Sequence, residues 1–290
     1  MPSPARLLPL FTLLCSALSA VADDTPRVLR DIAYAPDAHR LQTYDLHLPT
    51  PAPDGRPAPL VVWIHGGAWK VGDKNWNNVK YLVAHGYALA SIDYRLSGDA
   101  PFPAQIRDCN LALDHLLTHA PTHGIDPARV FLGGASAGGH LALLLGLARD
   151  RADFGADPDF HPLAILDFFG PADLTDVAAE IRDPHMRAEI GGAVKALLGG
   201  SDRHELARLA SPIHHVAGAR CPVLIFHGAD DDVVPLSQSQ KLESALRAAG
   251  APVKLVVVPA TGHDGPNFET PPMQRLVLDF LAEVERAPTR

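Results

Sequence analysis

Short apolar strands and helices alternate along most of this 290-residue chain. The candidate strands span residues 28–34, 42–48, 60–64, 87–92, 130–132, 163–169, 223–226 and 253–258. Apolar residues at helical spacing predict helices over residues 75–85, 103–119, 137–149, 237–249 and 274–285. Because continuous apolar strands are typical of parallel sheets covered on both faces, we expect a mostly parallel central sheet with helices on both sides. Ligands of such sheets bind beyond the carboxyl ends of the strands, so the residues that follow each strand are the candidates for function.

One segment interrupts this alternation. Residues 173–215 carry apolar residues at helical spacing but no candidate strand. We interpret the region of about residues 171–220 as a small helical cap inserted over the end of the sheet. The length allows one large domain or two small ones at about 150 residues per domain. We expect a single α/β domain over residues 23–290 that contains the cap.

The first 22 residues have the pattern of a secretory signal peptide. A positive Arg6 precedes an apolar run over residues 7–18, and Ala20-Val21-Ala22 offers small residues at a signal-peptidase site. The run is shorter than the roughly 20 apolar residues that span a bilayer. We therefore expect residues 1–22 to be removed, leaving a mature chain that begins at Asp23 and has no membrane segment. The expected location is the periplasm or the extracellular space, and the sequence leaves that choice open.

The composition excludes several classes of protein. The chain is 47% hydrophobic and 20% charged, which is typical of a globular protein and not of a disordered one. Its 25 Lys and Arg against 33 Asp and Glu argue against nucleic acid as a partner. The 15 histidines lack the spacing of a metal motif, so we expect no metal. Cys109 and Cys221 remain in the mature chain, either as two buried thiols or as a pair.

A nucleophilic serine is predicted at the end of the strand over residues 130–132. Gly134, Ser136 and Gly138 form a G-x-S-x-G pattern between this apolar strand and a helix that is apolar nearly all round. The pattern is that of a sharp strand-to-helix turn, which exposes a serine hydroxyl in strained backbone geometry. The amides at the start of the helix then point at the reaction centre.

Three other strand ends carry the partners that such a serine needs. His65-Gly66-Gly67-Ala68-Trp69 presents backbone N–H groups, unobstructed by large side chains, for a developing oxyanion. Residues 227–235 contain Asp230, Asp231 and Asp232, and His263 follows the last strand. Serine needs a base, and the imidazole needs a carboxylate that fixes its tautomer. The chain order serine, aspartate, histidine is that of the α/β-hydrolase triad.

These stretches together resemble the α/β-hydrolase esterases and lipases. The closest similarity is to the BD-FAE (feruloyl-esterase-like) carboxylesterases, near the hormone-sensitive-lipase-like family. The resemblance is carried by His65 to Trp69, residues 93–97, residues 134–140, Ser211-Pro212-Ile213, the run from His227 to Pro235, and Gly262-His263.

That resemblance implies an α/β-hydrolase fold and a complete catalytic site. It assigns Ser136 as the nucleophile, His263 as the general base and Asp231 as the residue that orients the histidine. The oxyanion hole would be formed by the N–H groups of Gly67, Ala68 and Ala137, with Ala68 where the family has a third glycine. No cofactor and no metal are implied.

The expected function is a serine carboxylesterase, with acetyl, feruloyl or small xenobiotic esters as substrates, free or linked to polysaccharide. Two alternatives stay open. An arylformamidase would cut an amide with the same triad, and it shares the H-G-G-x-W pattern of His65 to Trp69. A binding protein on a hydrolase scaffold would be non-catalytic, although such proteins usually lose a triad member. The sequence does not determine the oligomeric state.

Overall fold

Eight strands form one sheet whose order places the ends of distant segments side by side. The computed structural model describes residues 27–200 and 203–287, and the predicted signal peptide lies outside them. The strands are β1 (Arg27–Ala33), β2 (Thr43–Leu48), β3 (Ala58–Ile64), β4 (Ala88–Ile92), β5 (Ile125–Ala135), β6 (Ala164–Phe168), β7 (Val223–Gly228) and β8 (Val253–Val258). Their order is β1-β2-β4-β3-β5-β6-β7-β8. Only the pairs β1–β2 and β2–β4 are antiparallel, which confirms the predicted α/β-hydrolase fold.

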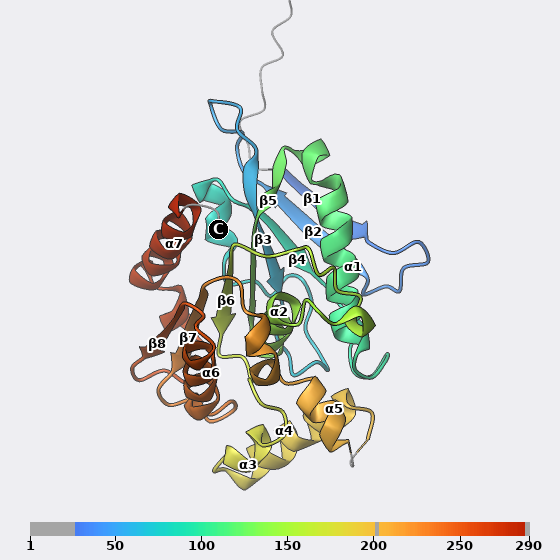
Figure 1. Ribbon diagram of the computed structural model, residues 1–290, viewed down its shortest axis with the longest axis vertical. Coiled ribbons are helices and arrows are strands. Elements are labelled where there is room, and N and C mark those ends of the chain that lie inside the picture. Colours follow the sequence, from blue (N-terminus) through green and yellow to red (C-terminus); the bar gives the residue numbers. More distant parts are fainter. Residues whose placement is uncertain (1–26, 201–202, 288–290) are drawn as a thin grey trace, which may run out of the picture.

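Helices cover both faces of the sheet (Figure 1). The α-helices are α1 (Ala104–His119), α2 (Ala137–Leu147), α3 (Val177–Glu180), α4 (Pro184–Leu197), α5 (His204–Leu209), α6 (Leu236–Ala248) and α7 (Pro271–Arg286). Short 3-10 helices are η1 (Lys80–His85), η2 (Ala120–His123), η3 (Ala152–Phe154), η4 (Pro212–Gly218) and η5 (Pro266–Glu269). Buried hydrophobic residues of the described segments form two core clusters. In the first, α1, α2 and α6 pack against one face of the sheet, and in the second, η1 and α7 pack against the opposite face.

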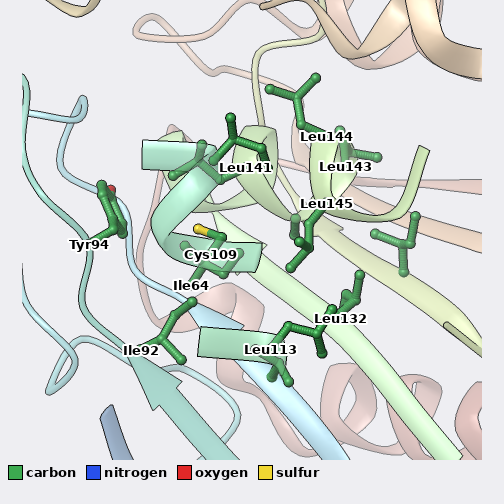
Figure 2. Close-up of a cluster of buried hydrophobic side chains, with 14 of the residues drawn as sticks. Ile64, Ile92, Tyr94, Cys109, Leu113, Leu132, Leu141, Leu143, Leu144 and Leu145 are labelled. Atoms are coloured by element: carbon green, nitrogen blue, oxygen red, sulfur yellow. The ribbon is translucent and has the colours of Figure 1, made fainter. Parts of the chain in front are cut away.

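Helix α2 lies in the centre of the first cluster. All of its residues are buried, as its apolar sequence predicts. Figure 2 shows Leu141 and Leu145 of α2 in the same apolar cluster as Cys109 of α1 and Leu132 of β5. Cys109 and Cys221 are both buried free thiols, so the structure has no disulfide between them. The burial of α2 matters for function because this helix begins directly after Ser136.

The helix predicted over residues 75–85 is largely wrong. Only Lys80–His85 is helical, as the 3-10 helix η1, and the preceding residues form turns. The Asp73 side chain accepts the N–H of Asn75, and the Asn77 amide donates to the carbonyl of Lys74. Such local side-chain bonds to the backbone compete with a helix. The predicted helix would place Trp76, Val79 and Val83 on one face, but Trp76 is 53% exposed whereas Val79 and Val83 are buried.

The segment predicted as a cap connects β6 to β7. It contains α3, α4, α5 and η4, and Figure 1 shows α3 to α5 gathered at the end of the molecule toward which the parallel strands point. Helix α3 is fastened to α6, where Lys241 pairs with Asp176 and Glu180 and Ser237 donates to Glu180. Across residues 27–200 and 203–287, no helix is long and apolar enough to cross a membrane.

Candidate active site

Ser136 occupies a strained turn between β5 and α2. Its φ is 55° and its ψ is −121°, a conformation that residues with a side chain rarely adopt. The Ser136 N–H donates to the carbonyl of Phe168 on β6 at 2.8 Å, which ties the turn to the neighbouring strand. A Cβ on Gly138 would lie 2.0 Å from the carbonyl oxygen of Ile64, so only glycine lets α2 approach β3 this closely. The predicted turn geometry is therefore confirmed.

Ser136, His263 and Asp231 form a continuous hydrogen-bonded chain. His263 Nε2 lies 2.8 Å from Ser136 Oγ, and His263 Nδ1 lies 2.8 Å from Asp231 Oδ2. Because a carboxylate only accepts, Nδ1 carries the proton and donates it to Asp231, which leaves the Nε2 lone pair facing the serine hydroxyl. The three side chains come from the ends of β5, β7 and β8. This arrangement can take the proton from Ser136 and return it.

Asp231 is a buried carboxylate with several donors. Its side chain is 0% exposed, and its Oδ1 accepts the N–H groups of Val233 and Val234 at 2.9 Å each. Burial alone would raise the pKa of Asp231, but the hydrogen bonds from His227 and His263 outweigh it and hold the pKa well below its usual value. Asp231 is therefore ionised throughout the neutral range. Asp230 and Asp232 are exposed, and in the described part of the chain Asp231 is the one of the three aspartates that is hydrogen bonded to His263.

The loop after β3 presents backbone amides beside the serine. Gly67 and Ala68 have φ values of 104° and 50°, so this turn is also strained. The N–H groups of Lys70 and Val71 both donate to the carbonyl of Gly67, which fixes the turn. In the described part of the chain Gly67 and Ala68 donate no hydrogen bond, and Ala137 is the first residue of α2, where N–H groups lack a helical partner.

Contacts of His65 and Trp69 fix the loop after β3 to its surroundings. The Nδ1–H of His65 donates to the carbonyl of Gly66 at 2.7 Å, and Tyr94 donates to the carbonyl of His65. The Trp69 ring packs edge-on against His140, with ring centroids 5.0 Å apart. Burial lowers the pKa of His65, so the imidazole is neutral at neutral pH and suits a positioning role rather than that of a second acid.

A pocket of about 730 Å³ opens in front of Ser136. Of the six predicted site residues, five line this pocket: Gly67, Ala68, Ser136, Ala137 and His263. The sixth, the buried Asp231, does not. Helix α4 contributes Met186, Glu189 and Ile190 to its wall. The opposite wall comes from the loop after β3, which includes two exposed apolar side chains, Val71 at 56% and Trp76 at 53%.

Two residues at the site have no role in the interpretation of the sequence. Trp76 belongs to the helix predicted over residues 75–85, and the competing signal is the Asn-rich run that favours turns at residues 75–78. His227 enters the sequence analysis only as the first residue of the run to Pro235 that carries the family resemblance, yet its Nε2 lies 3.2 Å from Asp231 Oδ2. Among residues 27–200 and 203–287, no three His, Cys, Asp or Glu side chains gather in a way that could hold a metal.

Comparisons with known proteins agree with this fold. A family model described as BD-FAE matches residues 44–246, and the chain belongs to the BD-FAE family. The match includes Ser136 and Asp231 but ends before His263, which the structure brings to them. Esterase LipC of Mycobacterium tuberculosis is 30% identical over 80% of this chain and 60% of its own length.

Solved structures show the same architecture. A truncated carbohydrate esterase from gut microbiota has a TM-score of 0.78 at 27% identity, covering 92% of this chain and 99% of its own. An inhibited esterase B from Lactobacillus rhamnosis has a TM-score of 0.79 at 25% identity, covering 91% and 88%. The chain spans 60% and 61% of the length of the first two curated relatives that it matches.

Replacing Asp231 should affect hydrolysis far more than replacing either neighbour. Asp231→Asn keeps the shape but removes the carboxylate that fixes the His263 tautomer, so we expect kcat to fall about 10²- to 10⁴-fold. Asp230→Asn and Asp232→Asn are matched controls on exposed residues and should cost less than about tenfold. Measuring kcat of the three variants on one aryl ester checks this. A crippled Asp230→Asn or Asp232→Asn variant would refute the assignment.

Proposed function

We propose that the protein is a serine carboxylesterase that works through Ser136, His263 and Asp231. The observation that carries the proposal is the unbroken hydrogen-bonded chain from Ser136 Oγ through His263 to Asp231 at the floor of a pocket. Its relatives support the choice of reaction, because they are named esterases and carboxylic ester hydrolases.

The reaction follows from the positions of these groups. Ser136 Oγ attacks the ester carbonyl carbon while His263 Nε2 takes its proton, and the carbonyl electron pair moves onto oxygen. Gly67, Ala68 and Ala137 line the pocket, and their N–H groups would stabilise that oxyanion. The carbon–oxygen bond to the alcohol then breaks, and His263 protonates the alcohol as it leaves. Water attacks the acyl-enzyme with His263 as base, which releases the acid and restores Ser136.

The two alternatives from the sequence are less well supported. An amidase such as an arylformamidase needs the same triad, but the names of the matched relatives are those of esterases. A binding protein without catalysis has no need for an imidazole aligned between a serine hydroxyl and an ionised carboxylate. Parallel assays on aryl acetates and N-formylkynurenine separate ester from amide preference.

Ser136 should be the hydroxyl that reacts with a fluorophosphonate probe. It alone among the described serines lies at the strained turn and is hydrogen bonded to His263. Mass spectrometry of the labelled protein locates the adduct, and a label on another serine would refute the proposal. Ser136→Ala should abolish labelling, keep the melting temperature, and retain about 10³-fold catalysis over water from the oxyanion hole.

The rate of the same reaction should rise with pH along one limb. His263 acts as a base only when neutral, and free imidazole titrates at about pH 6.5. Asp231 adds no second limb in this range because its pKa is held well below its usual value. A rate that stays flat from about pH 5 to 8, with chemistry rate-limiting, would count against a histidine base.

We further propose an ester attached to a sugar or to an aromatic group as the substrate. The half-exposed ring of Trp76 lines the pocket beside Asn75, Asn77 and Asn78, and an indole face next to amides suits a sugar ring or an aromatic acyl group. The Trp63 indole N–H donates to the carbonyl of Trp76, which fixes that segment on the sheet. The similarity to a carbohydrate esterase from gut microbiota supports a polysaccharide-linked ester.

Trp76→Ala should weaken binding of a large substrate and spare a small one. We expect KM for an acetylated xylo-oligosaccharide to rise about 3- to 10-fold, since an aromatic contact contributes about 0.5–1.5 kcal/mol. KM for a short alkyl acetate should stay unchanged. Val71→Ala is the matched control, because Val71 is exposed in the same wall but has no ring. Equal losses on both substrates would refute a role of Trp76 in selectivity.

Export from the cytoplasm is part of the proposal. The signal-like residues 1–22 lie outside the described part of the chain and support a periplasmic or secreted enzyme by their sequence alone. N-terminal sequencing of protein recovered from the producing cell should begin at Asp23. A retained Met1 in a membrane fraction would instead mean an uncleaved anchor.

A further inference from the structure

A second histidine contacts the carboxylate of Asp231. His227 lies at the end of β7 and is fully buried. Its Nε2 lies 2.8 Å from the carbonyl oxygen of Val234 and 3.2 Å from Asp231 Oδ2, and its Nδ1 lies 2.7 Å from Ser239 Oγ on α6. His227 does not line the pocket, so it has no direct access to a substrate.

The neighbours of His227 determine which nitrogen carries its proton. A carbonyl oxygen and a carboxylate only accept hydrogen bonds, so Nε2 must be the donor to Val234 and Asp231. In a neutral imidazole the lone pair is then on Nδ1, where the hydroxyl of Ser239 donates to it. Helix α6 thus fixes the tautomer of His227 in the same way that Asp231 fixes the tautomer of His263.

We propose that His227 is a positioning residue of the esterase, whose Nε2–H holds Asp231 in place and shares the negative charge that faces His263. The proposal rests on the proposed function. Asp231 Oδ2 lies between two imidazoles, 2.8 Å from His263 and 3.2 Å from His227, while Oδ1 is fixed by two backbone N–H groups. The carboxylate therefore has donors on both oxygens and little freedom to rotate away from His263.

The alternative is that His227 merely fills space in the core. Two titratable groups face it, Asp231 from the following loop and Asp167 from β6, where burial raises the pKa of Asp167 to about 7. An apolar side chain would fill the same space, but it would leave the Val234 carbonyl without its donor and concentrate the charge of Asp231 toward His263. A more concentrated negative charge favours the protonated imidazole. Loss of His227 should then shift the acidic limb of the rate profile to higher pH.

Three substitutions separate positioning from packing. His227→Leu removes both nitrogens, His227→Asn keeps a polar group that is too short to place a donor at Nε2, and His227→Gln restores an N–H near that position. Leu242→Ala is the matched control. Leu242, on α6, is as fully buried as His227, but its apolar side chain makes no hydrogen bond to the triad. This control should lower the melting temperature without moving the pH profile.

The readouts are kcat and KM on an aryl ester and the rate of fluorophosphonate labelling of Ser136 against pH. For His227→Leu and His227→Asn we expect kcat and the labelling rate to fall about 10- to 100-fold, as for other groups that orient active-site ligands. KM should change less than about twofold, because His227 lies outside the pocket. The midpoint of the acidic limb should move to higher pH, and His227→Gln should recover most of the rate and the original midpoint.

Other outcomes would overturn the proposal. Wild-type rates and midpoint in His227→Asn, or a midpoint shift of the same size in Leu242→Ala, would mean that His227 only packs. If His227→Leu does not fold, the comparison of His227→Asn with His227→Gln still decides. Failure of the proposed function would be seen separately, as a wild-type protein that neither hydrolyses the ester nor takes the label at Ser136.

Discussion

The strained turn at Ser136 is the constraint on which the rest of the site depends. A positive φ at a residue with a side chain persists only when the surroundings over-determine it. Here the N–H of Ser136 is bonded to β6, and the close approach of α2 to β3 leaves no room for a Cβ at Gly138. Helix α2 is buried along its whole length, so the turn cannot relax by moving the helix. The rigidity of the nucleophile therefore comes from the buried core around α2, β3 and β6.

The charge of Asp231 depends on the groups that donate hydrogen bonds to its carboxylate. Asp231 is fully buried, and burial by itself favours a neutral carboxyl. Donors from two backbone amides and two imidazoles reverse that preference. Asp167 on β6 shows the opposite outcome: burial raises its pKa to about 7, and in the described part of the chain only the Gly170 N–H donates to it, while its Oδ2 has no partner. Two buried carboxylates therefore have pKa values shifted in opposite directions, and the one with more hydrogen-bond donors has the lower pKa.

The regular elements could be predicted from the sequence because their signals are local. The strands of the described residues stand near their predicted positions, and the central ones, such as β3 and β6, are largely continuous apolar runs. The glycines of the Ser136 turn identify it without any long-range information. The pairing of His227 with Asp231 could not be predicted, because it depends on how the loop after β7 folds back over its own strand. The position of Trp76 could not be predicted either. Its apolar spacing with Val79 and Val83 favoured a helix, whereas the hydrogen bonds of Asp73 and Asn77 to the backbone stabilise turns.

The loop after β3, which the sequence analysis assigned in part to a helix, forms part of the pocket wall. Ser136, Asp231 and His263 follow strands of the parallel sheet, where register fixes each position to its neighbour. The wall of the pocket comes from the loop after β3 and from α4, which are not part of the sheet. A substitution in that wall can alter which ester fits without moving the hydrogen bonds of the triad, whereas a substitution at Gly138 would move the nucleophile itself. The triad is thus positioned by the sheet, whereas the loop after β3 supplies both wall residues and the backbone amides of Gly67 and Ala68 beside Ser136.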